Sequence, residues 1–166
     1  MKKLAKTIGG LGFAAIVALM SLTPAEAHHS FAMYDTSKPV AVTGVLTRTN
    51  PDAFHFQLFI AQLNAERTKV LRDKDGAPII WVVELSGAGE VAATGVTEST
   101  FPPGTILTVG FYPLRDGQPG GTRNEYGLYR CPDKTPPAAG KTCDTVAGGK
   151  LYGKGTLPAT EAAVKP

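Results

Sequence analysis

The stretch VAVTGVLTR, residues 40–48, decides the fold that the sequence predicts. It is rich in β-branched side chains, which favour the extended backbone of a strand. Gly44 lies at its centre, and a glycine inside a strand is typical of a bulge or a sharp bend. The stretch therefore predicts a first strand that curls enough to pair at both ends of a small barrel.

The segments that follow predict four more strands and one helix. The predicted strands are residues 53–62, 78–85, 106–112 and 122–130, with a short helix over residues 87–94 that Ser86 would cap. Three strands, a short helix and two strands follow one another in the order of the OB-fold, a Greek-key barrel. We therefore predict a mainly β protein, a small OB-fold-like five-stranded barrel with a short helix between strands three and four. A generic small β-sandwich is the alternative.

Residues 53–62 show the alternation of a strand that is buried on one side. The period of two predicts that Phe54, Phe56, Leu58 and Ile60 lie on one face, and His55 and Gln57 on the other.

The start of the chain has the three parts of a secretory signal peptide. Residues 1–6 (MKKLAK) hold three lysines and no acid, and residues 8–22 are apolar and uncharged. Residues 23–27 (TPAEA) have small side chains at the two positions that a signal peptidase reads. We expect cleavage after Ala27 and a periplasmic domain that begins at His28. The apolar run is short for a membrane-spanning helix, so we expect no membrane span after cleavage, the alternative being a retained N-terminal anchor.

Removing residues 1–27 leaves 139 residues, the size of one ordinary domain. We expect an OB-like barrel domain over residues 28–157 and a disordered tail over residues 158–166. The discarded part holds three of the 17 basic and one of the 14 acidic residues, so the remainder is nearly neutral. A nearly neutral domain lacks the basic stripe of a nucleic-acid binder, and we expect no nucleic-acid partner.

Two cysteines, Cys131 and Cys143, are predicted to form a disulfide, because an exported protein with two cysteines usually joins them. The alternative, a thiol redox or soft-metal site, has neither a CxxC spacing nor a nearby histidine in its favour. A short strand is predicted over residues 150–152, after this loop.

Several short motifs give the chain a resemblance to a family of small exported bacterial proteins of unknown function. They are His28-His29-Ser30-Phe31, Tyr34-Asp35, Lys38-Pro39-Val40, Thr43-Gly44-Val45, Thr49-Asn50-Pro51, Val83-Glu84-Leu85, Pro103-Gly104 and Asp116-Gly117. The resemblance covers about residues 28–125, leaves the cysteine loop outside, and implies an OB-like periplasmic domain but no activity. Where that family reads Asn-Pro-His-Ala-aromatic, this chain has Asp52, and His55 follows three residues later.

The three histidines of the chain, His28, His29 and His55, suggest a copper(II) site. A terminal His28 offers an α-amine and an imidazole to one metal ion, and copper(II) favours such tetragonal nitrogen ligation. The arrangement resembles the histidine brace of copper chaperones and oxidative polysaccharide monooxygenases. His55 would be the third nitrogen ligand, with Asp52 as an axial or outer carboxylate. His29 offers a second route through the amine, the intervening amide and its own imidazole.

Other interpretations remain open. The histidines can equally be a polar chain start and a surface residue. Glu84 and Glu90 show no evident partner, so we expect these carboxylates to be solvated or to cap a helix. We predict a non-enzymatic periplasmic binding module with copper as its metal. The first alternative is an OB-like module that binds a protein or glycan partner without metal, through a face with Trp81, Tyr112, Tyr126 and Tyr129. The second is a copper-dependent oxidative enzyme.

Overall fold

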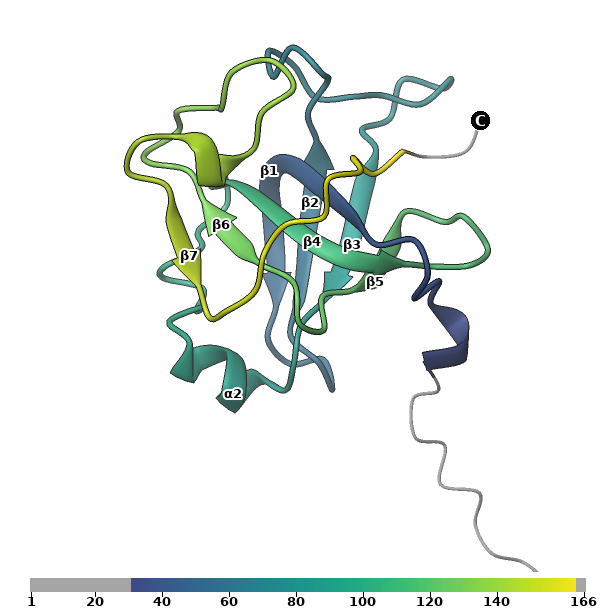
Figure 1. The fold of residues 1–166 in the computed structure, drawn as a ribbon, viewed down its shortest axis with the longest axis vertical. Helices are drawn as coiled ribbons and strands as arrows, with labels where there is room; N and C mark the ends of the chain where they lie inside the picture. The colour runs from purple at the N-terminus through teal and green to yellow at the C-terminus, as the bar shows by residue number, and fades with distance from the viewer. Residues whose placement is uncertain (1–30, 164–166) are drawn as a thin grey trace, which may run out of the picture. The chain divides into compact units, whose positions relative to one another are not determined.

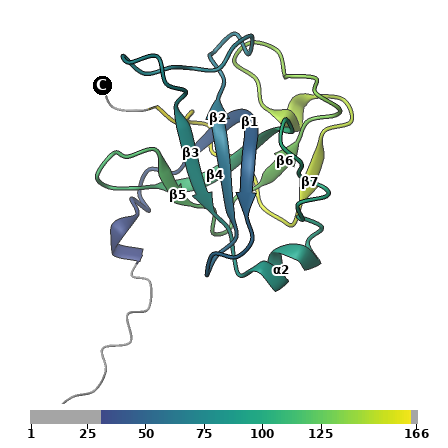
Figure 2. The same ribbon diagram turned by 180° about the vertical axis from the view of Figure 1, so that it is seen from behind.

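The structure is a computed structural model in which residues 31–163 are described. Strands dominate it, with one short helix below the sheet (Figures 1 and 2). The elements are η1 (Phe31–Met33), β1 (Val40–Asn50), β2 (Gln57–Gln62), β3 (Ile80–Glu84), α2 (Ala88–Ala93), β4 (Ile106–Pro113), β5 (Gly120–Thr122), β6 (Leu128–Arg130), η2 (Cys143–Thr145) and β7 (Lys150–Tyr152).

The first five strands form a closed barrel in the order β1-β2-β3-β5-β4, and β4 pairs back onto β1. The pairing of β3 with β5 is parallel, and the other pairings are antiparallel. This connectivity, with α2 between β3 and β4, confirms the predicted OB-fold-like barrel. Strands β6 and β7 extend the sheet beyond β4.

Strand β1 closes the barrel by pairing with two partners. Its first half, from Val40 to Val45, lies against β4, and its second half, from Gly44 to Asn50, lies against β2. At the crossover a Cβ on Gly44 would lie 2.4 Å from the backbone oxygen of Ala61, so only glycine fits there. The bend predicted from Gly44 is therefore present, and a register shift between Leu46 and Arg48 adds a bulge.

Inward-facing side chains of the five strands fill the barrel, and α2 adds one residue to the core. The fully buried members include Val42, Leu46, Leu58, Ile60, Val83, Leu107, Val109 and Phe111, and α2 contributes Val91. In β3 the alternation of Trp81 and Val83 toward the interior leaves the side chain of Glu84 half-buried at the end of the strand.

Two local predictions around the helix and the second strand were wrong. Strand β2 begins at Gln57, and Phe54 is 79% exposed in the preceding turn instead of lying on the core face. Helix α2 begins after Gly87 without a side-chain cap, so Ser86 does not cap it. The Ser86 carbonyl instead accepts a hydrogen bond from the Phe56 amide, which continues the β2–β3 contact past the strand ends.

The predicted fifth strand over residues 122–130 is two strands separated by a turn. Asn124 in this turn has a left-handed backbone (φ 47°), which interrupts the extended conformation. Strand β5 pairs with the C-terminal end of β4 and β6 with its N-terminal part. The predicted strand over residues 150–152 is confirmed as β7.

The end of the described chain packs on the barrel, where the sequence predicted a disordered tail. It crosses the strands as a yellow segment in Figure 1. The Ala41 amide donates to the Thr160 carbonyl, the Ala162 amide donates to the Ala41 carbonyl, and Gln62 Nε2 donates to the Ala162 carbonyl, at 2.7–2.8 Å. Composition suggested disorder, but these backbone bonds and a buried Ala162 fix residues 158–163.

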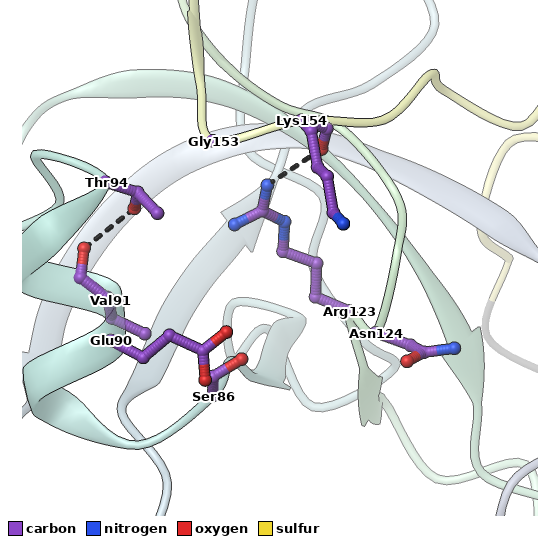
Figure 3. A pocket seen from close by; sticks show the side chains of 8 residues that line it. All are labelled: Ser86, Glu90, Val91, Thr94, Arg123, Asn124, Gly153 and Lys154. Atoms are coloured by element: carbon purple, nitrogen blue, oxygen red, sulfur yellow. Dashed lines mark hydrogen bonds between the residues drawn. The ribbon is translucent and has the colours of Figure 1, made fainter.

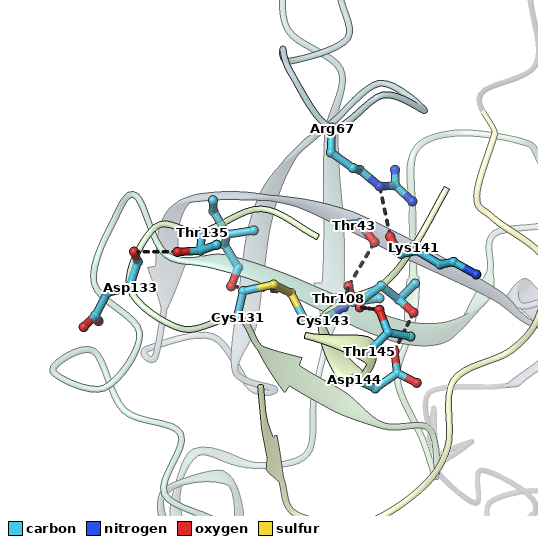
Figure 4. Close-up of a disulfide and its surroundings, with 12 residues drawn as sticks. Thr43, Arg67, Thr108, Cys131, Asp133, Thr135, Lys141, Cys143, Asp144 and Thr145 are labelled. Atoms are coloured by element: carbon cyan, nitrogen blue, oxygen red, sulfur yellow. Dashed lines mark hydrogen bonds between the residues drawn. A yellow bond between two sulfur atoms is a disulfide. The ribbon is translucent and has the colours of Figure 1, made fainter. Parts of the chain in front are cut away.

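The disulfide between Cys131 and Cys143 is present, as predicted (Figure 4). Both cysteines are buried, and the Cys143 amide donates to Thr108 Oγ1, which in turn contacts Thr43 Oγ1 at 2.9 Å. The bridge therefore fastens the loop after β6 to the outside of β4 and β1.

Within residues 31–163, no helix has the length and apolarity that crossing a membrane requires.

Candidate functional site

A row of polar side chains runs across three neighbouring strands at one end of the barrel. Asn50 of β1 pairs in register with Gln57 of β2, and Gln57 pairs with Glu84 of β3. Asn50 Nδ2 donates to Gln57 Oε1, and Gln57 Nε2 donates to Glu84 Oε1, each at 3.3 Å. The antiparallel register thus places three hydrogen-bonding side chains side by side, with the carboxylate at the end of the row.

The second oxygen of Glu84 receives two groups from other parts of the chain. The hydroxyl of Tyr34 donates to Oε2 at 3.0 Å, and His55 Nδ1 lies 3.6 Å from the same oxygen. We call Tyr34, Asn50, His55, Gln57 and Glu84 the Glu84 cluster. The expectation that Glu84 is a solvated carboxylate without a partner was therefore wrong.

Tyr34 carries the beginning of the described chain to this cluster. It is 8% exposed, and burial, the hydrogen bond to Glu84 and the charge of Glu84 together raise the pKa of its hydroxyl to about 12. The adjoining backbone is held by the β4–β5 loop: Arg115 donates through Nε to the Ala32 carbonyl and through its amide to the Met33 carbonyl, both at 2.9 Å. We call residues 31–35 the arm.

The structure places the predicted metal ligands in two groups. His28 and His29 lie outside the described residues. His55 and Asp52 lie in the same turn between β1 and β2, where Asp52 is exposed and His55 is half-buried beside Glu84. Within residues 31–163, no group of three or more His, Cys, Asp or Glu side chains is arranged to hold a metal ion.

The aromatic residues proposed for a binding face do not form an open platform. Trp81 is buried, donates from Nε1 to Gln62 at 2.8 Å and packs on Phe111. Tyr112 and Tyr126 pack edge-to-face on each other, and Tyr129 packs against the disulfide region.

Two other aromatic side chains are exposed, and both adjoin the Glu84 cluster. Phe31 of the arm is 54% exposed with its ring 6.2 Å from that of Tyr34, and Phe54 has its ring 5.0 Å from that of His55.

Sequence reasoning identified His55 and Gln57 as a polar face but missed Tyr34 and Glu84. The signal for Glu84 is its position in residues 78–85 (PIIWVVEL), where it is the one charge in an apolar strand. The contact with Tyr34 joins residues 50 positions apart and has no local signal.

Comparison with known proteins gives one family and no characterised relative. The model of a family of unknown function, DUF6152, matches residues 16–124. The match spans every member of the Glu84 cluster and ends before the disulfide. No curated protein and no solved structure matches the chain.

Proposed function

The chain belongs to the DUF6152 family of unknown function, and we propose that it is an exported, non-enzymatic binding module that holds copper(II) through a mature N-terminal His28 together with His55. The observation that carries the proposal is the meeting of the arm and His55 at one oxygen of Glu84.

A terminus at His28 would be joined to the arm by a short stretch of chain. Three peptide units separate His28 from Phe31, and consecutive Cα atoms lie 3.8 Å apart, so the terminus is at most about 11 Å from Phe31 along the chain. Phe31 in turn packs on Tyr34, whose hydroxyl shares Glu84 with His55. The proposal requires that a terminal amine, the His28 imidazole and the His55 imidazole converge on one ion.

Glu84 suits the role of the carboxylate behind a ligand histidine. Histidines that bind metals usually direct their other ring nitrogen at a carboxylate or carbonyl, which fixes the ring and raises the basicity of the ligand nitrogen. Because His55 Nδ1 faces Glu84 Oε2, we assign the bond to copper to Nε2. Asp52, three residues away in the same turn, would supply a carboxylate to the ion or to its ligands.

Export is part of the proposal because it creates the ligand. Residues 1–27 have the pattern of a signal peptide, and cleavage after Ala27 would release the α-amine of His28. The disulfide between Cys131 and Cys143 supports an oxidising compartment such as the periplasm, where such bonds persist.

The test uses the protein that the cell exports. The full chain is expressed with its own leader, the protein is recovered from the periplasm, and its intact mass identifies the first residue. Copper(II) is then titrated against a competing chelator for the wild type and for His28→Gln, His29→Gln and His55→Gln. We expect one ion per chain, and affinity losses of at least tenfold for His28→Gln and His55→Gln but a small change for His29→Gln.

The three variants separate the proposal from its nearest alternative. If copper binds through the amine, the first amide and the second imidazole, His29→Gln abolishes binding and His55→Gln has no effect, which would contradict our assignment. A mature protein that begins elsewhere than His28 would also contradict it.

The exposed rings of Phe31 and Phe54 favour a second candidate, a module that binds a protein or glycan partner beside the Glu84 cluster without metal. Exposed aromatic side chains are common anchors in such contacts. If this candidate is correct, the wild type shows no saturable copper(II) binding, and a Phe31→Ser, Phe54→Ser double variant loses the partner that the wild type binds.

A further inference from the structure

Arg123 is a buried cation in the turn after β5. Its residue is 8% exposed. Three hydrogen bonds hold the guanidinium: Nε donates to the Tyr126 carbonyl at 2.7 Å, and Nη2 donates to the carbonyls of Tyr152 and Lys154 at 2.8 and 3.2 Å. These bonds tie the turn after β5 to the end of β7 and to the segment that follows it, and they fix the orientation of the guanidinium plane.

No carboxylate in residues 31–163 forms an ion pair with this guanidinium. A buried charge without a counter-charge is costly, and buried cations are normally paired. Burial lowers the pKa of Arg123, but an arginine stays charged at neutral pH. The other deeply buried arginine, Arg67, is paired with Glu161. Arg123 therefore lacks a carboxylate partner of the kind that Arg67 has in Glu161.

The guanidinium has donors to spare, and they adjoin a pocket. Arginine carries five N–H groups, of which Nε and Nη2 use three, so the two on Nη1 make no hydrogen bond within the described residues. Arg123 lines a pocket of about 250 Å³ together with Ser86, Asn124 and Lys154. In Figure 3 one terminal nitrogen of Arg123 is bound to the Lys154 carbonyl, and the other points toward helix α2.

We propose that this pocket binds a small monocarboxylate, with the carboxylate on Nη1 of Arg123 and near the ammonium of Lys154. Arginine donors match the geometry of a carboxylate, and bonds between two charged groups are the stronger kind. The hydroxyl of Ser86 and the amide of Asn124 supply further polar contacts at the rim.

Glu90 determines the charge of the ligand. Its carboxylate lines the same pocket and lies next to Ser86, across from the guanidinium (Figure 3). Arg123, Lys154 and Glu90 together carry one net positive charge, which a single carboxylate neutralises. A second negative charge, as on phosphate at neutral pH, would face Glu90 without compensation.

The experiment follows backbone amide and arginine Nε–H signals of the exported protein by NMR, while sodium acetate, sodium lactate or inorganic phosphate is added at constant ionic strength. We expect saturable shifts around Ser86, Asn124 and Gly153 and at Arg123 Nε–H with acetate and lactate, and weaker binding of phosphate. Glu90→Gln should raise the affinity for phosphate.

The mutational test uses Lys154→Gln. Arg123 is not substituted, because its hydrogen bonds to backbone carbonyls also stabilise the fold. Lys141→Gln is the matched control: it is also an exposed lysine whose backbone carbonyl binds an arginine, here Arg67. Lys154→Gln should weaken acetate binding roughly two- to fivefold, as for loss of one exposed charge, and Lys141→Gln should leave it unchanged. Shifts that do not saturate, equal effects of the two variants, or tighter binding of phosphate than of acetate would overturn the proposal.

Discussion

The hydroxyl of Tyr34 donates a hydrogen bond to Oε2 of Glu84 at 3.0 Å. This contact joins the arm to the end of β3, where His55 approaches the same carboxylate oxygen. The arm is therefore positioned relative to the turn between β1 and β2. The proposed copper site depends on this relationship.

The pH dependence of stability reports on the Tyr34–Glu84 contact. The pKa of Tyr34 is raised from 10.0 to about 12 in the folded protein, so the folded state holds this proton more tightly than the unfolded state. The stabilisation from Tyr34 should be complete below pH 10 and should disappear as the pH rises from 10 to about 12. Denaturant unfolding of the wild type and Tyr34→Phe across this range should show a difference that shrinks. A difference that is independent of pH would contradict the contact.

Gly44→Ala should destabilise the barrel. The new Cβ would meet the Ala61 oxygen at 2.4 Å and Ile60 Cγ2 at 2.5 Å, so β1 must separate from β2 at the crossover. We expect a loss of about 1–3 kcal/mol in the free energy of unfolding. Gly89→Ala is the control, because it adds a methyl group in open space within α2 and should be neutral or slightly stabilising. Similar effects of the two substitutions would show that β1 does not cross where we place it.

Removal of the disulfide should lower stability without destroying the barrel. Cys131 and Cys143 enclose a short loop outside the five barrel strands, and a loop of this length contributes about 3 kcal/mol. The double variant Cys131→Ala, Cys143→Ala should unfold at lower denaturant concentration and keep its β-type circular dichroism. Reduction of the wild type should reproduce the same shift. Loss of all β structure in the variant would mean that the loop is essential to the barrel.

The packed C-terminal segment can be tested with the one tryptophan of the chain. Trp81 donates to Gln62, and Gln62 donates to the Ala162 carbonyl, so the segment stabilises this buried pair. A chain that ends at Leu157 should lose about 1–3 kcal/mol, because Gln62 is left without its acceptor, and its tryptophan emission should shift to longer wavelength. Unchanged emission and stability would mean that this segment does not pack on the barrel, as the composition of the tail suggested.

The sequence predicted features that depend on local pattern, and it missed those that depend on distant pairing. The bend at Gly44, the β-branched strands and the cysteine pair each have a local signal, and together they gave the barrel. Gln62 and Ala162 lie 100 positions apart, and their hydrogen bond has no such signal.

The turn before β2 shows that a local pattern can also predict a strand where the chain forms a turn. Alternation in residues 53–62 placed Phe54 in the core, but β2 begins only at Gln57, after the turn that carries His55. The prediction for His55 and the error over Phe54 come from the same segment. Its alternating sequence pattern runs on through a turn, whereas the strand itself begins only after that turn.

Electron paramagnetic resonance of the copper(II) complex tests the central claim most directly. Protein that begins at His28, labelled with ¹⁵N in its histidine rings, is loaded with one copper(II) ion per chain, and the imidazole nitrogens bound to the metal are counted. We predict two in the wild type and in His29→Gln, and one in His55→Gln. A spectrum that His55→Gln leaves unchanged would contradict the account, because the arm and the turn would then not share a metal.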